Sequence, residues 1–210
     1  MSSNQSLQGA SKAGISESFP LDKPRSLYGG TKLASEIIIG EYAQTYSLKT
    51  IINRCGVITG PGQFGKIDQG VIVLWLAKHH FKQPLAYLGY GGCGKQLRDI
   101  LHVDDLFEAL KLQISNFDKY SGQIFNLGGG QKNSVSLLEL TKYCQDLTGN
   151  HVKIKSDKKT RSNDIRIFVT DSGKFSKLSN WQPKKDIPTT LSQIYDWIKQ
   201  NQDQLRQILM

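Results

Sequence analysis

The sequence predicts an α/β fold. Segments with helical periodicity alternate with short β-branched runs along the 210 residues, which is the pattern of a sheet covered by helices. A composition of 38% hydrophobic and 21% charged residues is typical of a globular chain with one large domain or two small ones. The longest apolar run, Val71 to Ala77, is far shorter than the roughly 20 residues that span a membrane.

The first expected elements are a loop, a helix and a buried strand. Residues 1–27 indicate the end of a strand followed by a loop, because Pro20 and Pro24 do not fit a helix interior. From Tyr28 to about Tyr46, apolar residues recur every three or four positions, which predicts an amphipathic helix. The run from Lys49 to Arg54 is rich in β-branched residues and predicts a buried strand.

The remaining elements continue this alternation. Further helices are expected at residues 69–81, from Asp104 or Asp105 to Ile114, from Ser134 or Ser136 to about Leu147, and at 190–209. Strands are expected at residues 85–88, 100–103, 123–127 and 165–169. Asp104 or Asp105 is expected to cap its helix, and Ser136 with Glu139 has the pattern of a capping box.

Several motifs that suggest chemistry are better explained by structure. The stretch Gly89 to Gly94 fits GxGxxG, but a dinucleotide-binding turn must lead into a helix, and here the chain continues as loop and strand. A near match to a phosphate-binding P-loop has Gln96 where a Ser or Thr would hold magnesium. We therefore expect a tight turn between strands. His79, His80 and His102 lack the spacing of metal ligands, so no metal site is expected.

A stronger signal is the pair Tyr28 and Lys32, four residues apart at the start of the first helix. Residues at this spacing share one helical face. A free tyrosine, with a pKa of about 10, is a poor base at neutral pH, but a nearby ammonium favours the phenolate and so permits proton exchange with a substrate hydroxyl. Tyr195 and Lys199 have the same spacing within an ordinary amphipathic pattern, where core packing explains the tyrosine.

The net charge of +9 leaves the class of partner open. Nucleic acid, a phosphorylated small molecule and solvated basic faces are all compatible with the basic runs Lys153–Arg166 and Lys174–Lys185. No zinc-finger spacing or RNA-binding motif accompanies the charge, which disfavours nucleic acid. The three cysteines lie far apart and the N-terminus lacks the features of a signal peptide, so the sequence predicts a cytoplasmic protein.

Several segments together resemble the extended short-chain dehydrogenases that act as NAD-dependent nucleotide-sugar epimerases and dehydratases. The resemblance is carried, in order, by SLYGGTKLASE, IINRCGVITGPGQF, LAYLGYGGCGKQLRDILHVDDL, FNLGGG, Arg161 to Asp164, and Asp171. Within the family, QFGKIDQGVIVLW and RSNDIRIFVTD look most like the branch of CDP-paratose (CDP-tyvelose) 2-epimerases.

The resemblance implies a catalytic and cofactor site around the first helix. Tyr28 would be the acid/base, and Lys32 would be its partner and would also hold the nicotinamide ribose of NAD. Asn4 would stand in place of the family's Ser or Thr hydroxyl, and an asparagine donates a hydrogen bond but does not relay a proton. Cys55 would contact the cofactor.

The resemblance also implies a site for a nucleotide-diphosphate sugar, with a CDP-sugar as the expected substrate. Arg98 and Arg161 would bind the diphosphate, because guanidinium groups match phosphate oxygens. Asp164 would bind the ribose. The residues expected to line the nucleotide and sugar pocket are Gln69, Ala86, Tyr87 and Leu88.

The resemblance implies that residues 1–62 form the C-terminal part of a doubly wound (Rossmann) parallel sheet. Residues 63–210 would form a smaller α/β substrate-binding domain that is partly interwoven with that sheet. The family's glycine-rich NAD loop would precede Met1, so a fragment or a natural truncation is expected. A homodimer is expected, with no nucleic-acid or membrane partner. Two functions stay open: 2-epimerisation of a CDP-linked dideoxyhexose through a transient keto sugar, and a catalytically incompetent nucleotide-sugar-binding remnant.

Overall fold

The computed structural model describes residues 8–23, 26–65, 69–160 and 164–209. Asn4 and Arg161, two of the expected site residues, lie outside these ranges. The helices, in chain order, are α1 Leu27–Tyr46, α2 Val71–His80, α3 Val103–Ser115, α4 Phe117–Tyr120, α5 Leu137–Thr148, α6 Gly173–Ser179, α7 Ile187–Gln200 and α8 Gln202–Leu209. The two 3-10 turns are η1 Tyr90–Gly92 and η2 Gln131–Asn133.

The strands form small sheets in which parallel pairing dominates. In chain order they are β1 Ala10–Ser11, β2 Gly14–Ile15, β3 Ile51–Cys55, β4 Val57–Thr59, β5 Leu85–Leu88, β6 Leu97–His102, β7 Gln123–Leu127, β8 Ser134–Ser136, β9 Ile154–Asp157 and β10 Ile167–Phe168. The pairs β3–β7, β4–β6, β10–β6 and β5–β9 are parallel, whereas β1–β2 and β6–β8 are antiparallel. Parallel neighbours need crossover connections, here supplied by helices, so the α/β prediction is confirmed.

Local sequence explains the best-predicted elements. The side chain of Ser26 accepts a hydrogen bond from the Gly29 N–H at 3.1 Å and so starts α1. The helix ends at Ser47, which adopts a left-handed φ of 53°. At α5, the side chains of Ser136 and Glu139 cap each other's backbone N–H groups, as the capping-box pattern predicts.

Other predictions of local structure are wrong in detail. The N-cap of α3 is His102, whose Nδ1 accepts from the Asp104 N–H at 3.0 Å. Asp104 and Asp105 instead lie in the first turn, where their negative charge favours the helix dipole. The stretch expected to be a loop before α1 contains the β1–β2 hairpin, and the expected final helix is divided at Asn201 into α7 and α8. The turn at Gly89–Gly94 leads from β5 into β6, as predicted.

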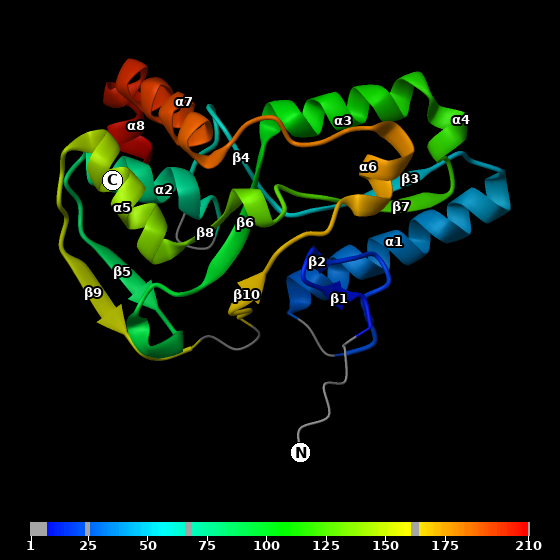
Figure 1. Ribbon diagram of the computed structural model, residues 1–210, viewed down its shortest axis with the longest axis horizontal. Coiled ribbons are helices and arrows are strands. Elements are labelled where there is room, and N and C mark those ends of the chain that lie inside the picture. The colour runs from blue at the N-terminus through cyan, green and yellow to red at the C-terminus, as the bar shows by residue number, and fades with distance from the viewer. Residues whose placement is uncertain (1–7, 24–25, 66–68, 161–163, 210) are drawn as a thin grey trace.

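Two hydrophobic clusters hold these elements together, and the helices that carry them lie toward opposite ends of an elongated molecule in Figure 1. The first cluster lies among α2, α5 and α7, with Leu76, Leu140, Leu191 and Ile194 fully buried. The second lies between α3, β7 and α6, and its buried members are Leu101, Ala109, Tyr120, Phe125, Leu127, Phe175 and Trp181. Strand β6 contributes Ile100 to the first cluster and Leu101 to the second. Because side chains alternate along a strand, β6 joins both ends of the molecule.

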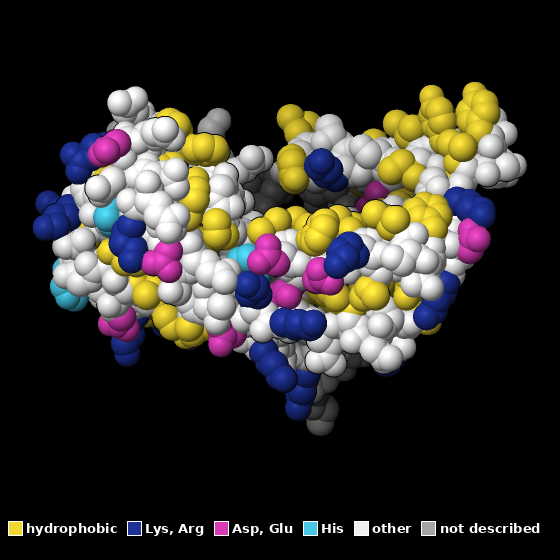
Figure 2. Space-filling model, turned by 90° about the horizontal axis from the view of Figure 1, so that it is seen from above, with side chains coloured by type: hydrophobic (Ala, Val, Ile, Leu, Met, Phe, Trp, Pro, Cys, Tyr) yellow, Lys and Arg dark blue, Asp and Glu magenta, His cyan; other side chains and the backbone are white. Residues whose placement is uncertain are grey.

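Helices α1 and α3 carry apolar side chains that nothing in the described part of the chain covers. Their exposed apolar residues include Ile37, Ile38, Tyr42 and Tyr46 of α1 and Phe107, Leu110 and Ile114 of α3. Figure 2 shows hydrophobic side chains along both helices with a hollow between them. A groove of about 370 Å³ lies there, lined by residues such as Ile39, Ile51 and Phe117. No helix in the described ranges is long and apolar enough to cross a membrane.

Candidate functional site

The Tyr28–Lys32 pair lies on an open face of α1. The Lys32 Nζ is 5.5 Å from the centroid of the Tyr28 ring, within the distance at which an ammonium is attracted to an aromatic face. The Tyr28 side chain is 63% exposed, and no carboxylate in the described ranges forms an ion pair with Lys32. The predicted sharing of one helical face is therefore confirmed, and both groups are open to a ligand.

The second Tyr–Lys pair has the same spacing in different surroundings. Lys199 Nζ lies 4.8 Å from the centroid of the Tyr195 ring, but it is also paired with Asp196 at 2.8 Å. Tyr195 packs against the first hydrophobic cluster and meets the His80 ring edge-to-face at 5.6 Å. Tyr195 thus contributes to packing, as predicted, and only Tyr28 combines the spacing with an accessible phenol.

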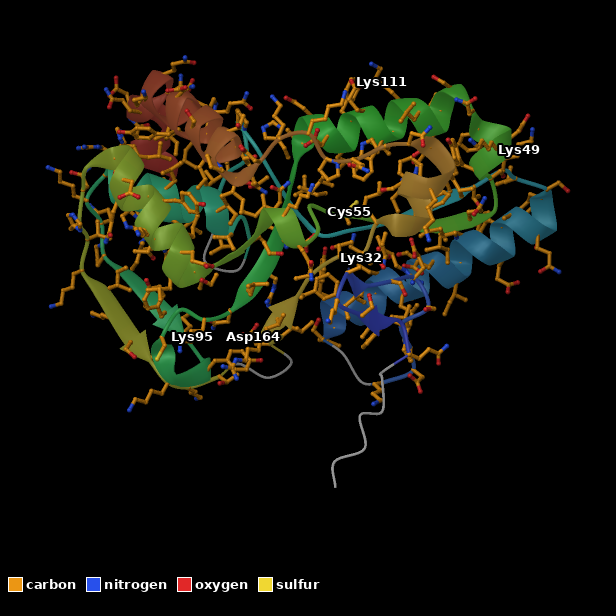
Figure 3. The ribbon with its side chains drawn as sticks, in the orientation of Figure 1. Lys32, Lys49, Cys55, Lys95, Lys111 and Asp164 are labelled. Carbon is orange, nitrogen blue, oxygen red and sulfur yellow. The ribbon has the colours of Figure 1, made fainter. Side chains whose placement is uncertain are left out.

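The carboxyl ends of β3 and β7 lie beside each other at one edge of their parallel pair. Cys55 ends β3 and pairs in register with Leu127, which ends β7 before the Gly128–Gly130 turn. In open parallel sheets, ligands bind outside the carboxyl ends of the strands. Figure 3 shows Lys32 and Cys55 in the middle of the molecule and Asp164 near its lower edge beside Lys95, whereas Lys49 and Lys111 lie on its periphery. The Cys55 side chain reaches solvent, yet the protein atoms around its sulfur raise the pKa of the thiol by desolvation.

The turn at Gly128–Gly130 is held by a buried carboxylate. Asp99 Oδ2 accepts a hydrogen bond from the Gly130 N–H at 3.2 Å, and Asp99 Oδ1 accepts one from the Thr170 hydroxyl at 3.1 Å. A Cβ on Gly129 would lie 1.9 Å from the Ile100 carbonyl oxygen, so only glycine fits there. These contacts bring the turn against β6 and keep the edge of β7 in place.

Arg98 and Asp164 form an ion pair between β6 and the segment that precedes β10. Arg98 Nη2 lies 3.4 Å from Asp164 Oδ1, and both side chains are 27% exposed. The guanidinium also donates to the carbonyl oxygens of Leu97 at 2.8 Å, Arg166 and Ile165. Partial burial lowers the pKa of Arg98, and the negative charge of Asp164 acts in the opposite direction. Two residues expected separately in the substrate site are therefore in contact.

Tyr90 is a member of this cluster that the sequence did not reveal. Its hydroxyl donates to the Asp164 carbonyl oxygen, and its backbone N–H donates to the Thr160 hydroxyl at 3.0 Å. Tyr90 has a left-handed φ of 48° and is followed by Gly91 and Gly92, which also have positive φ. The only sequence signal was a lone aromatic residue within a glycine-rich turn.

The residues expected to line the pocket differ in their surroundings. Tyr87 stacks on Trp75 with ring centroids 5.9 Å apart, and its hydroxyl lies 2.7 Å from the Thr141 hydroxyl. The Tyr87 side chain is thus used in packing, which leaves its backbone as the part able to meet a ligand. The Leu88 carbonyl accepts from the Gln96 side chain. Ala86 precedes Tyr87 on β5 and is half-buried, and Gln69 is exposed just before α2.

Metal-binding groups are dispersed in the described part of the chain. No group of three or more His, Cys, Asp and Glu side chains is placed there to hold an ion. His79 and His102 are buried singly, and desolvation is the main cause that lowers the pKa of each imidazole. Both are therefore neutral at pH 7.

Parallel strands joined by crossover helices define the doubly wound class of α/β proteins, whose ligands bind outside the carboxyl ends of the strands. The NAD dependent epimerase/dehydratase family matches residues 1–128, and the chain belongs to this family. The family resemblance expected from the sequence is thereby confirmed, as is the cofactor named in the family's description.

Individual relatives agree with the family but are longer than this chain. The CDP-paratose 2-epimerase of Salmonella typhi is 33% identical over 190 residues, which cover 88% of this chain and 54% of that enzyme. A UDP-glucuronate 4-epimerase of Thermodesulfobacterium geofontis is 26% identical over 210 residues, 99% of this chain and 61% of that enzyme. The chain thus spans little more than half the length of these relatives.

A solved structure also shows the same fold. The UDP-glucuronic acid 4-epimerase from Bacillus cereus, in complex with UDP-glucuronic acid and NAD, superposes with a TM-score of 0.79 at 25% identity. The match covers 93% of this chain and 59% of that one. The expected Rossmann-type α/β architecture is confirmed, whereas the division into domains at residue 62 stays a prediction.

Proposed function

We propose that this chain carries the acid–base and substrate-binding residues of a nucleotide-sugar epimerase that inverts C2 of a CDP-linked dideoxyhexose through a transient keto sugar. The observation that carries the proposal is the accessible Tyr28 phenol with the Lys32 ammonium 5.5 Å from its ring. The 33% identity to a CDP-paratose 2-epimerase supports CDP as the nucleotide and C2 as the inverted centre.

In this proposal Tyr28 transfers the proton, and Lys32 stabilises the deprotonated phenol. The Tyr28 oxygen accepts the proton of a sugar hydroxyl as that carbon is oxidised, and it returns the proton when the hydroxyl is restored. Lys32 supplies positive charge on the same face, which favours the deprotonated phenol, and its remaining N–H groups can hold a ribose hydroxyl. The family resemblance implies that Asn4 stands in place of a hydroxyl, and because an asparagine does not relay a proton, the proposal assigns this transfer to Tyr28.

The residues at the carboxyl edge fit the nicotinamide–ribose end of NAD. Lys32 offers hydrogen-bond donors, Tyr28 offers a hydroxyl, and Cys55 offers a thiol whose raised pKa keeps it neutral. These residues would hold the nicotinamide ribose of NAD, and the chemistry supplied there would be reversible hydride transfer at the sugar carbon. The part that this chain supplies is the proton transfer and the orientation of the ribose.

The substrate-binding proposal rests on Arg98 and its neighbours. A diphosphate would take the place of Asp164 on the Arg98 guanidinium, with Arg161 as the second cation, and Asp164 would then accept from the ribose. Tyr90 already joins the same segment and would keep it close to β6. Gln69 and the β5 residues Ala86, Tyr87 and Leu88 would face the nucleotide and sugar, Tyr87 through its backbone.

A binding experiment on this chain tests the proposal. Isothermal titration with NAD and with CDP should give binding of both, and we expect Lys32→Met to weaken NAD binding by about tenfold or more. The matched control is Lys199→Met, which removes the lysine of the second Tyr–Lys pair and should leave NAD binding unchanged. Binding of CDP without NAD would instead support the catalytically incompetent remnant.

Turnover and the diphosphate contact are tested separately. With NAD and CDP-paratose, inversion at C2 is followed by proton NMR, and Tyr28→Phe should abolish it while Tyr195→Phe retains it. Arg98→Leu should weaken CDP binding by about tenfold to a hundredfold, since a charge-assisted contact is lost. Arg206→Leu, which removes an arginine packed on Phe81, is the control. Unchanged CDP affinity in the Arg98 variant would contradict the assigned role.

The proposal includes a cytoplasmic homodimer. Cys55, Cys93 and Cys144 are all free thiols, which suits a reducing compartment. The exposed apolar side chains of α1 and α3 offer a surface for a second copy. Sedimentation velocity should give the mass of a dimer, and Ile38→Asp should shift it to that of a monomer.

A further inference from the structure

Helix α1 is held to the rest of the protein with little help from burial. None of the described side chains among its 20 residues is buried. Ile37, Ile38 and Tyr42, which would normally anchor such a helix, are at least half exposed. Since the burial of apolar surface is the usual force that positions a helix, another contact must fix α1 against the sheet.

A two-point ion pair between α1 and β3 is a contact of this kind. Arg54 Nε donates to Glu36 Oε1 at 2.8 Å, and Arg54 Nη2 donates to Glu36 Oε2 at 2.6 Å. The two side chains are 23% and 18% exposed, so the pair is shielded from bulk water. The hydrogen bond to Glu36 is the main cause that raises the pKa of Arg54. Two parallel hydrogen bonds between planar groups fix orientation as well as distance.

Arg54 also forms a hydrogen bond outside α1. Its Nη1 donates to the Glu17 carbonyl oxygen at 3.4 Å, in the segment that follows the β1–β2 hairpin. The Glu17 carboxylate accepts from the Asn126 N–H at 2.7 Å, and the Asn126 side chain donates to the Ile15 carbonyl at 2.9 Å. Arg54 and Asn126 are also opposite each other in the β3–β7 ladder. The guanidinium therefore belongs to a rigid hydrogen-bonded group rather than to a free surface side chain.

Helical geometry connects this group to the acid–base pair. Tyr28, Lys32 and Glu36 are spaced four residues apart and share one face of α1. At 1.5 Å per residue, Lys32 lies about 6 Å and Tyr28 about 12 Å from Glu36 along the axis. A shift of α1 at Glu36 is thus carried directly to both groups.

We propose that Glu36 and Arg54 are positioning residues that hold α1 at a fixed place on β3, so that Tyr28 and Lys32 face the carboxyl edge of the sheet. This inference rests on the proposed function of Tyr28 and Lys32. Neither positioning residue meets the substrate or cofactor. The Arg54 guanidinium already donates two hydrogen bonds to Glu36. Arg54 therefore differs in role from Arg98, to which the diphosphate is assigned.

The test separates the charge of the pair from its geometry. Glu36→Gln keeps the size of the side chain and removes its charge, whereas Arg54→Lys keeps the charge and removes the planar guanidinium that forms two parallel hydrogen bonds. The matched control is Glu108→Gln on α3, which breaks an exposed ion pair with Lys111. Hydrogen exchange of the 210-residue chain is measured for residues 27–46 and, as an internal reference, for β6.

We expect each of the two variants to speed exchange in residues 27–46 by about tenfold or more and to leave β6 within about twofold. The double variant should be no faster than either single one, because the two side chains act as a unit. In turnover of CDP-paratose, kcat should fall by about tenfold or more with KM for the sugar nucleotide nearly unchanged, as expected for misplaced catalytic groups.

The outcomes distinguish this inference from the proposed function. Unchanged exchange in residues 27–46, additive effects in the double variant, or an unchanged kcat in an active protein would each overturn the positioning role. If the wild-type chain turns over no CDP-paratose, the assigned reaction is wrong, and the exchange rates alone then decide whether the pair anchors α1. A loss of stability throughout the chain, with β6 exchanging as fast as α1, would also contradict a local anchor.

Discussion

Truncation of Phe175 tests the packing that supports β3 and β7. Phe175 is fully buried in the second cluster, with its ring centroid 5.1 Å from that of Phe125 and 5.6 Å from those of Tyr120 and Trp181. Burial of such a ring contributes about 1.5–3 kcal/mol, and each aromatic pair adds about 0.5–1.5 kcal/mol. We therefore expect Phe175→Ala to lower the free energy of unfolding by about 4 kcal/mol, within the usual range for a buried phenylalanine.

The assay is urea unfolding followed by tryptophan fluorescence, in which Trp181 reports on the neighbouring ring, and by circular dichroism. Phe107→Ala is the control, because that ring is 59% exposed on α3, and its effect should stay within about 0.5 kcal/mol. A loss below about 1 kcal/mol for Phe175→Ala would refute the packing argument, since it lies outside the range for buried rings. If Phe175→Ala does not fold, Phe175→Leu at about 1–2 kcal/mol replaces it in the same comparison.

Three further predictions concern pH, glycine and helix capping. Desolvation lowers the pKa of His102. Below about pH 6.5 the unfolded chain therefore binds a proton that the folded chain does not, so the free energy of unfolding falls as the pH falls. The variant His102→Asn keeps a capping acceptor and should flatten this decline in the free energy of unfolding between pH 7.5 and about 5.5. Gly129→Ala should destabilise the fold because its Cβ would overlap the Ile100 carbonyl, whereas Gly40→Ala, in open space within α1, should stabilise by about 0.5–1 kcal/mol in urea unfolding. Ser136→Ala should cost about 1 kcal/mol through loss of the capping box, and an unchanged unfolding midpoint would contradict that.

The elements that the sequence predicted well are those that local forces define. The bounds of α1 differ from prediction by one residue at its start, and β7 has the predicted bounds. In both, hydrophobic periodicity and nearby capping or turn residues act within a few positions. The elements that were missed depend on distant partners. Strand β9, read as part of a basic run, is extended because it pairs with β5, and the short helix α6 exists because Phe175 packs into the second cluster.

The sequence by itself determined that Tyr28 and Lys32 share one face, because a separation of four residues places two side chains one above the other on any α-helix. It also determined the family through the order of its motifs. Only the tertiary structure decided that Arg98 forms an ion pair with Asp164, and that Arg54 of β3 forms one with Glu36 of α1. These pairs join residues far apart in the chain, and the contacts arise only when the parallel strands and their crossover helices have packed.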